Sequence, residues 1–227
     1  MKQRRAARLA AALLALAGCA VAAPTSVGDS APPEPISYAR MEGEVLRAIN
    51  RARRDPPGYA TNVEALLPRF RGRILHRPGR EVPTQTNEGP AAVREAIRVL
   101  RSQRPVPTLS LAGGLARAAR DHIADQGPRG RTGHGGSDGS TTDVRASRYG
   151  RWLVSLSENI AYGRFLTGEE VITDLIVDDG VGDRGHRRNI FDPTARVAGI
   201  ACGPHRTYGS VCVIMQAGGY TEAQRSN

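Results

Sequence analysis

Two apolar runs near the C-terminal end of the chain place the strongest constraint on its fold. Residues 197–202 and 211–215 are rich in strand-forming side chains, and a Gly- and Pro-containing stretch joins them, which predicts a hairpin. A hairpin centred on Thr207 sets Cys202 opposite Cys212. The Cα atoms of a non-hydrogen-bonded antiparallel pair lie about 4.5 Å apart, within disulfide reach. Two free buried thiols are the alternative, and export of the chain would favour the disulfide.

The N-terminal residues have the pattern of a secretory signal. Four basic residues within the first eight precede a short apolar run over residues 9–17. The run ends in Leu16-Ala17-Gly18-Cys19, which resembles the bacterial lipobox, where cleavage precedes a lipid-modified cysteine. We therefore expect residues 1–18 to be removed and Cys19 to carry lipid. Cleavage near Ala22 or Ala23, which would discard Cys19, is the alternative.

The net charge of +10 does not indicate nucleic-acid binding. Four positive charges lie in the signal, which leaves a net charge of +6, and every remaining basic residue is arginine because Lys2 is the only lysine. Residues 50–104 hold 12 Arg against 5 acidic residues, whereas residues 151–227 hold 8 Arg against 9. With only ten aromatic residues in the chain, stacking platforms for bases are not supported. We expect an arginine-rich surface facing anionic lipid or glycan, and no nucleic-acid partner.

One α+β domain is expected to follow a flexible tether. Residues 19–37 are rich in Ala, Pro, Ser and Gly, which is typical of a linker, and the domain is expected over residues 38–222. Apolar spacing predicts helices that start near Tyr38, Ala91, Ser110 and Glu169. Helices and strands alternate without a βαβ rhythm, which favours α+β over a doubly wound parallel sheet.

Two stretches are predicted to lie outside the regular core. Residues 61–105 are rich in Arg and Pro and are expected to form an insertion that packs peripherally. Residues 127–140 contain six glycines, which predicts an irregular loop directly after the helix that starts near Ser110. The sequence contains no run of about 20 apolar residues, so it predicts no membrane-spanning helix.

Three segments carry titratable residues in glycine-rich or turn contexts. They are Thr132-Gly133-His134-Gly135-Gly136-Ser137-Asp138-Gly139-Ser140, Ser157-Glu158-Asn159-Ile160-Ala161 and Asp183-Arg184-Gly185-His186-Arg187-Arg188-Asn189-Ile190. In this order they resemble the bacterial SCP-like members of the CAP superfamily, which includes cysteine-rich secretory, antigen 5 and pathogenesis-related proteins. The resemblance implies a three-layer α-β-α sandwich with a central antiparallel sheet.

The resemblance also implies a cleft lined by two histidines and two acidic residues. His134, Glu158 and His186 match three of these positions. The fourth falls at the end of the preceding helix, where Asp178 and Asp179 stand in place of the usual glutamate, so the choice between them stays open.

The chemistry of this set suits more than one role. His134, His186 and Glu158 offer donors for Zn²⁺ or another divalent cation, although no cofactor is required. A hydrogen-bonded polar network that fixes the loops is an equal alternative. A hydrolase would need a nucleophile such as Ser140 acting with His186 and Glu158, and neither a Gly-x-Ser-x-Gly nor a His-Glu-x-x-His motif is present.

The sequence therefore predicts an exported protein held at the cell envelope by its N-terminal lipid, periplasm-facing or extracellular. We expect it to bind a small ligand, a lipid or sterol, an envelope glycan or a divalent metal in the cleft, and not to be an enzyme. An envelope hydrolase using the same cleft is one alternative. A partner-binding module acting through the arginine-rich insertion is the other.

Overall fold

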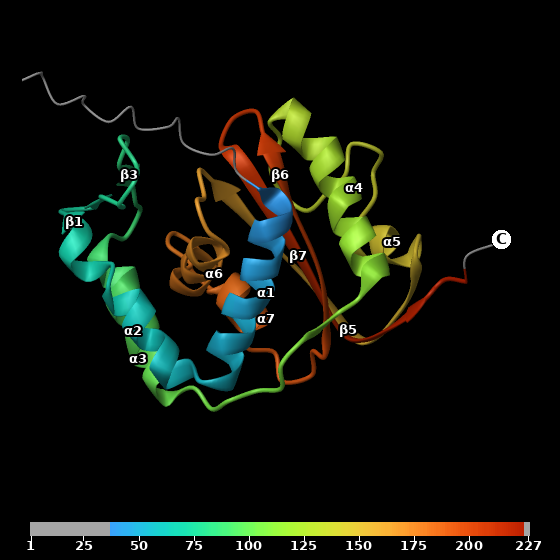
Figure 1. Cartoon of the computed structure of the whole chain (residues 1–227), viewed down its shortest axis with the longest axis horizontal. Helices are drawn as coiled ribbons and strands as arrows, with labels where there is room; N and C mark the ends of the chain where they lie inside the picture. Colours follow the sequence, from blue (N-terminus) through green and yellow to red (C-terminus); the bar gives the residue numbers. More distant parts are fainter. Residues whose placement is uncertain (1–36, 225–227) are drawn as a thin grey trace, which may run out of the picture. The chain divides into compact units, whose positions relative to one another are not determined.

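The computed structural model describes residues 37–224, in which helices cover both faces of one sheet (Figure 1). The strand order is β4-β6-β7-β5, formed by β4 (Ser110–Leu111), β5 (Gly150–Gly163), β6 (Val197–His205) and β7 (Gly209–Glu222). The three long strands pair antiparallel, and only the short β4 runs parallel to its neighbour β6. The α+β sandwich is confirmed, with one parallel pair at an edge of an otherwise antiparallel sheet.

Several predictions about the N-terminus lie outside the described residues. These are the signal peptide, the lipid on Cys19 and the tether up to residue 36. Between residues 37 and 224, no helix is long and apolar enough to cross a membrane.

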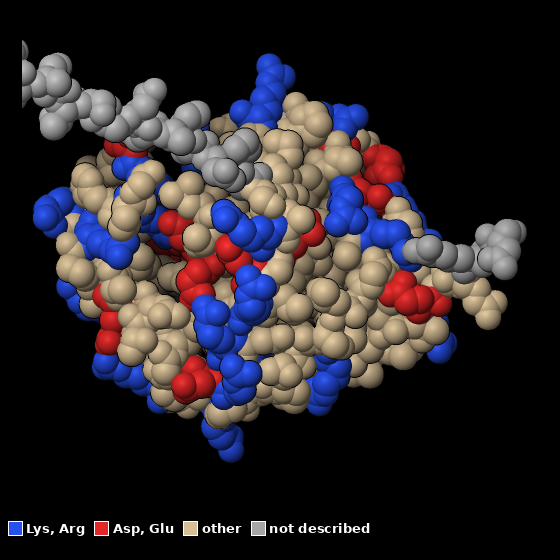
Figure 2. Space-filling view, viewed as in Figure 1, with Lys and Arg blue, Asp and Glu red and all other residues tan. Residues whose placement is uncertain are grey.

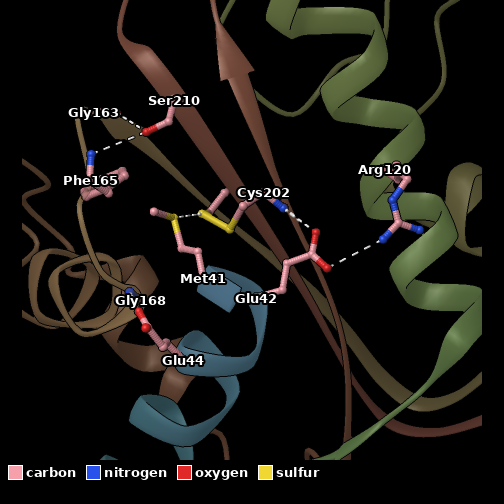
Figure 3. The surroundings of a disulfide bond; sticks show 10 residues. Met41, Glu42, Glu44, Arg120, Gly163, Phe165, Gly168, Cys202 and Ser210 are labelled. Atoms are coloured by element: carbon pink, nitrogen blue, oxygen red, sulfur yellow. Dashed lines mark hydrogen bonds and ion pairs between the residues drawn. A yellow bond between two sulfur atoms is a disulfide. The ribbon is translucent and has the colours of Figure 1, made fainter. Parts of the chain in front are cut away.

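The C-terminal hairpin has the predicted register. Its ladder pairs Val197 with Ala217 and His205 with Gly209, so that Cys202 lies opposite Cys212. The two cysteines form a disulfide with a Cα–Cα distance of 4.1 Å. Figure 3 shows Met41 of helix α1 (Tyr38–Arg54) beside this bond, with its Sδ 3.7 Å from Cys212 Sγ. The disulfide is therefore buried between the hairpin and α1.

Glu42, the next residue of α1, links three elements (Figure 3). Its carboxylate accepts a hydrogen bond of 3.0 Å from the Cys202 backbone N–H on β6 and lies 3.6 Å from Arg120 of helix α4 (Gly113–Arg129). This backbone N–H lies on the side of β6 that β4 is too short to pair, so a side chain satisfies it in place of a strand.

The two faces of the sheet build two hydrophobic cores because strand side chains alternate between faces. Every second residue of the hairpin, including Ile200, Cys202, Cys212 and Ile214, packs against α1 and α6 (Gly168–Val177). The residues between them, including Ala201, Val211, Val213 and Met215, pack against α4. Gly199 lets α4 lie close to β6, because a Cβ there would collide with the backbone of Leu115 and Ala116.

Helix α4 lies three to four residues further toward the C-terminus than predicted. It begins at Gly113 and includes Gly127 and Pro128, so the predicted loop starts three residues later than expected. The glycine content was misleading at Gly127, where a Cβ would collide with the carbonyl oxygen of Pro204. The helix ends instead at Gly130, whose φ of 65° is the left-handed conformation that glycine adopts at helix ends.

The segment 61–105 contributes to the core, and the prediction that it packs peripherally is wrong for its main helix. It contains the end of α2 (Pro56–Glu64), a 3₁₀ turn (Leu67–Arg69), a small sheet of β1 (Phe70–Arg71), β2 (Ile74–Leu75) and β3 (Thr84–Gln85), and α3 (Pro90–Ser102). The apolar face of α3 is at most 5% exposed and belongs to the same core as α1; it comprises Ala92, Val93, Ala96, Ile97 and Leu100. The apolar stripe that the spacing predicts is thus a core face, and the arginines at positions 94, 98 and 101 lie on the opposite, exposed face of the helix.

Basic side chains gather over α1 in the view of Figure 2. This helix carries exposed arginines at positions 47, 51 and 54, and α3 repeats the same spacing at 94, 98 and 101. Both sets lie on the solvent faces of helices whose other faces are buried. The excess positive charge of this region is therefore a surface property.

Candidate functional site

Glu158 of the edge strand β5 is the buried centre of the first predicted group. Its side chain is 1% exposed, and so is that of Arg145 from helix α5 (Thr142–Ser147). Arg145 donates from Nη2 to both carboxylate oxygens, at 3.0 and 2.9 Å, and Thr142 donates to one of them at 3.0 Å. A buried carboxylate is stable only when it is paired and hydrogen bonded, and these contacts meet that requirement.

His134 completes this group from the glycine-rich loop. Its Nδ1 lies 2.9 Å from Glu158 Oε1, and because a carboxylate only accepts hydrogen bonds, Nδ1 carries the proton. The ring is 56% exposed, so its other nitrogen faces solvent. The loop is held next to this residue, where the Gly133 carbonyl accepts from His122 and Gln126 and the Gly133 N–H donates to Tyr162.

These contacts determine the ionisation of the buried acid. Burial by itself raises the pKa of Glu158, but the hydrogen bond from His134 and the charge of Arg145 outweigh it and hold the pKa below its ordinary value. Burial lowers the pKa of His122, which lies on the same side of the strand. The group therefore contains an ionised carboxylate and a neutral buried histidine.

Asp178 and His186 form a second, separate pair. Asp178 ends helix α6 in a left-handed conformation with φ of 56°. Its Oδ1 accepts from His186 Nδ1 at 2.7 Å, and its Oδ2 accepts from the His186 backbone N–H at 3.0 Å, at the start of helix α7 (Gly185–Ile190). Asp179 has a different role, because its carboxylate accepts the backbone N–H groups of Asn87 and Glu88 at 2.6 and 2.8 Å.

The two pairs lie on opposite sides of β5, since consecutive strand residues point to opposite faces. Ile160 belongs to the core on the α4 side, and Ala161 belongs to the core on the α1 side. Glu158 shares the first side. Asn159 shares the second, where its Nδ2 donates to the His186 carbonyl at 3.1 Å and its Oδ1 accepts from Asn189 at 2.8 Å. The dipeptide Glu158-Asn159 thus connects both pairs at one sheet edge.

A surface hollow of about 380 Å³ opens beside the first pair. Its lining includes His134, Glu158, Thr142, Trp152 and, from α7, Asn189. The other three predicted residues, at positions 178, 179 and 186, do not line it. Of the five site residues predicted from the sequence, the structure therefore brings two to this hollow, pairs two elsewhere and leaves Asp179 with neither pair.

The metal prediction meets a mismatch in the donor set. Across residues 37–224, no three His, Cys, Asp or Glu side chains stand together as a metal site. Both oxygens of Glu158 accept from Arg145, and both oxygens of Asp178 accept from His186. Because these hydrogen bonds already occupy the carboxylate oxygens, the two carboxylates have little capacity to bind a metal ion.

A hydrolase with a serine or threonine nucleophile needs a histidine within hydrogen-bond reach of the hydroxyl. Among the hydrogen bonds of the described residues, no histidine contacts a Ser or Thr hydroxyl as a base would. Ser140, the predicted candidate, is 5% exposed, and its backbone contacts Asp138 and Arg145. A His–carboxylate pair provides the base and the orienting group of a catalytic triad. Among the described residues, neither pair has a hydroxyl nucleophile hydrogen bonded to its histidine.

Sequence reasoning missed Arg145 and Trp152, and it read Asn159 and Asn189 only as parts of motifs. Arg145 gave no signal, because it is one of many arginines and its burial depends on α5 folding over β5. Strand β5 was missed because its Gly, Ser, Glu and Asn residues depart from strand preferences.

The chain also matches a known protein family. The family model of the cysteine-rich secretory protein (CAP) family matches residues 46–216. No curated protein matches the chain.

Two solved structures are similar to part of this chain. An extracellular protein containing an SCP domain from Bacillus anthracis is 18% identical, with a TM-score of 0.40, over 55% of this chain and 38% of that one. An outer surface protein from Borrelia burgdorferi is 15% identical, with a TM-score of 0.42, over 49% of this chain and 78% of that one. This chain thus spans well under half of the first protein's length. On the family match, which covers most of its length, the chain belongs to the cysteine-rich secretory protein (CAP) family.

Proposed function

We propose that this protein binds a small ligand at the edge of β5 and acts as a binding protein, not as an enzyme. One observation carries the proposal: both imidazoles have Nδ1 fixed by a buried carboxylate, while no hydrogen bond within residues 37–224 involves either Nε2. With Nδ1 donating to a carboxylate, Nε2 is the ring atom that is left to contact a ligand, and its direction is fixed. Such an atom accepts a hydrogen bond from a ligand hydroxyl or amide.

The lining of the hollow favours a saccharide unit of an envelope glycan over a lipid or sterol. Trp152 supplies an aromatic surface, and His134, Thr142 and Asn189 supply polar groups around it. A sugar has an apolar face for an aromatic ring and hydroxyl groups for the polar atoms. The hollow is also open and partly polar, which suits a hydroxyl-rich ligand.

Calorimetric titration with the trisaccharide of N-acetylglucosamine tests the proposal. We expect saturable binding that His134→Ala weakens at least tenfold, because the variant loses the fixed acceptor. His76→Ala is the matched control, since His76 is exposed and makes no side-chain hydrogen bond within the described part of the chain. Equal binding by His134→Ala and the wild type would contradict the proposal.

The same variants distinguish the alternatives. Glycan turnover that disappears in His134→Ala would favour the hydrolase. A Zn²⁺ affinity that falls in His134→Ala and His186→Ala would favour metal binding in place of the saccharide. Capture of an envelope partner that is unchanged in both variants would favour the arginine-rich surface as the functional site.

We further propose that the protein acts at the cell envelope, anchored by lipid on Cys19. The supporting observations are the basic and apolar N-terminal pattern and the Leu16-Ala17-Gly18-Cys19 motif. The burial of a disulfide in the hairpin agrees with an oxidising compartment. Mass spectrometry of the mature N-terminus is expected to show an acylated Cys19, and an unmodified start near Ala23 would contradict the anchor.

A further inference from the structure

The segment 66–93 builds a second cavity, of about 400 Å³, against the domain body. On the segment's side the lining combines the apolar residues Leu66, Phe70 and Leu75 with Arg77 and the polar residues at positions 84–87. On the body's side it is formed by the end of α6 and by Tyr162 and Tyr208. No residue lines both this cavity and the hollow beside His134. It is therefore separate from that hollow, although Asp179, one of the two aspartates considered for the cleft, contributes to its lining.

Polar contacts hold the outer wall of the cavity in place. Glu88 receives two hydrogen bonds of 2.6 Å from Arg184 and one of 2.8 Å from the Gly180 N–H. Glu95 of α3 receives two from Arg187, at 2.7 and 2.6 Å. Gly180 itself has a φ of 81° and lies so close to Asn87 that a Cβ would collide with it. The wall is thus fitted to the body and pre-formed.

The charged groups in the lining already have hydrogen-bond or ion-pair partners. Asp174 is paired with Arg77, and Asp179 accepts two backbone N–H groups from the wall. An anionic ligand would have to lose water without gaining an unpaired cation, which is unfavourable in a partly buried site. A neutral ligand carries no such penalty.

Two features offer specific contacts to a neutral ligand. Arg77 has a side chain that is 5% exposed, and its buried Nε–H has no hydrogen-bond partner in the described residues. Tyr208 is 45% exposed at the rim, where its ring lies 5.6 Å from that of Tyr162. The Arg77 Nε–H would be satisfied by an oxygen acceptor on the ligand, and the Tyr208 ring offers an aromatic surface.

We propose that this cavity binds a small neutral molecule with an apolar ring or short chain and one hydrogen-bond-accepting oxygen. Its volume lies within the range of small-molecule pockets, near the lower end, and suits one or two rings. The site is independent of the saccharide proposed for the hollow at His134. Binding here would add a second ligand to the same domain.

Fluorescence titration of the full chain with the neutral probe N-phenyl-1-naphthylamine tests the proposal. The blocking variants are Thr84→Trp and Gln85→Trp, at two exposed positions of the rim. Thr108→Trp is the matched control, because it adds the same side chain at an exposed threonine outside the cavity. Circular dichroism checks that all three variants fold.

We expect saturable binding of one probe per chain, at least tenfold weaker in Thr84→Trp and Gln85→Trp and unchanged in Thr108→Trp. His134→Ala should bind the probe like the wild type, and the anionic probe 8-anilinonaphthalene-1-sulfonate should bind more weakly. No saturable binding, or equal binding by the blocked variants, overturns the site. Loss of binding in His134→Ala assigns the probe to the other hollow, and tighter binding of the anionic probe overturns the preference for a neutral ligand.

Discussion

Glu158 and Arg145 have side chains that are each 1% exposed, so each charge depends on the other. A buried acid also lies in the second pair, in which the side chains of Asp178 and His186 are 1% and 26% exposed. In both places a buried acid orients a more exposed histidine. At the scale of single residues, the site therefore consists of two imidazoles, each oriented by a buried carboxylate.

Arg145→Ala is expected to destabilise the protein by about 3–5 kcal/mol, because it leaves a buried carboxylate without its cation. Urea unfolding measures the loss. Arg148→Ala is the matched control: Arg148 also binds carboxylates, but its side chain is 36% exposed, and such exposed pairs contribute little to stability. Similar losses in the two variants would show that the burial of Glu158 has little energetic weight.

The lowered pKa of Glu158 makes stability depend on pH in the acid range. The unfolded chain takes up the proton at a higher pH than the folded chain. The contribution is therefore complete above the ordinary glutamate pKa of about 4.3 and is lost as pH falls through the lower, folded value. Between pH 6 and pH 3, we expect the free energy of unfolding of the wild type to fall more steeply than that of Glu158→Gln. Parallel pH profiles would contradict this assignment.

At the scale of elements, the hairpin is the part that local rules specify most completely. Alternating apolar residues fix which face each side chain takes, and the turn fixes the register. Helix α1 could be predicted equally well, because its apolar spacing ends at Asp55, which then caps α2 by accepting the Gly58 N–H at 2.9 Å. Strand β5 could not be predicted, because its pairing with β7 and not its composition makes it a strand.

Removal of the Cys202–Cys212 disulfide tests how far the hairpin depends on it. The bond closes a short loop, with a sequence separation of 10, and loops of this size contribute about 3 kcal/mol. We expect the double variant Cys202→Ala/Cys212→Ala to lose about that much in urea unfolding. A reducing agent should destabilise the wild type and leave the double variant unchanged. If the reductant has no effect on the wild type, the bond does not stabilise the fold.

At the scale of the whole domain, we expect the segment 61–105 to unfold together with the core and not before it. The apolar face of α3 lies in the core that α1 and α6 build, and Glu95 binds the buried Arg187. Elements that share a core and buried polar contacts open together. A peripheral insertion would instead open on its own at a lower free energy.

Hydrogen exchange measures this cooperativity directly. We expect the central amides of α3 to exchange with the same opening free energy as those of β7 in the main sheet. Glu95→Gln should lower both values together, since Arg187 loses a charged partner, whereas Glu81→Gln, at an exposed position, is the control. If the amides of α3 exchange well before those of β7, the segment opens independently of the core, and the expectation is wrong.

The sequence alone determined the α+β class, the register of the hairpin, the positions of most helices and the motifs that contain His134, Glu158 and His186. These features follow from apolar periodicity, turn residues and local spacing, which the chain carries within short windows. It did not determine which aspartate pairs with His186 or which arginine neutralises Glu158, because those choices depend on segments far apart in the sequence.

Only the tertiary structure decided that the site consists of two pairs on opposite sides of one edge strand, and that residues 61–105 form part of the core. Both features have the same physical reason. A buried charge needs a partner and an apolar face needs a cover, and the chain carries many candidates for each. Which candidate is used depends on how the helices pack on the sheet, and that packing exists only in the folded domain.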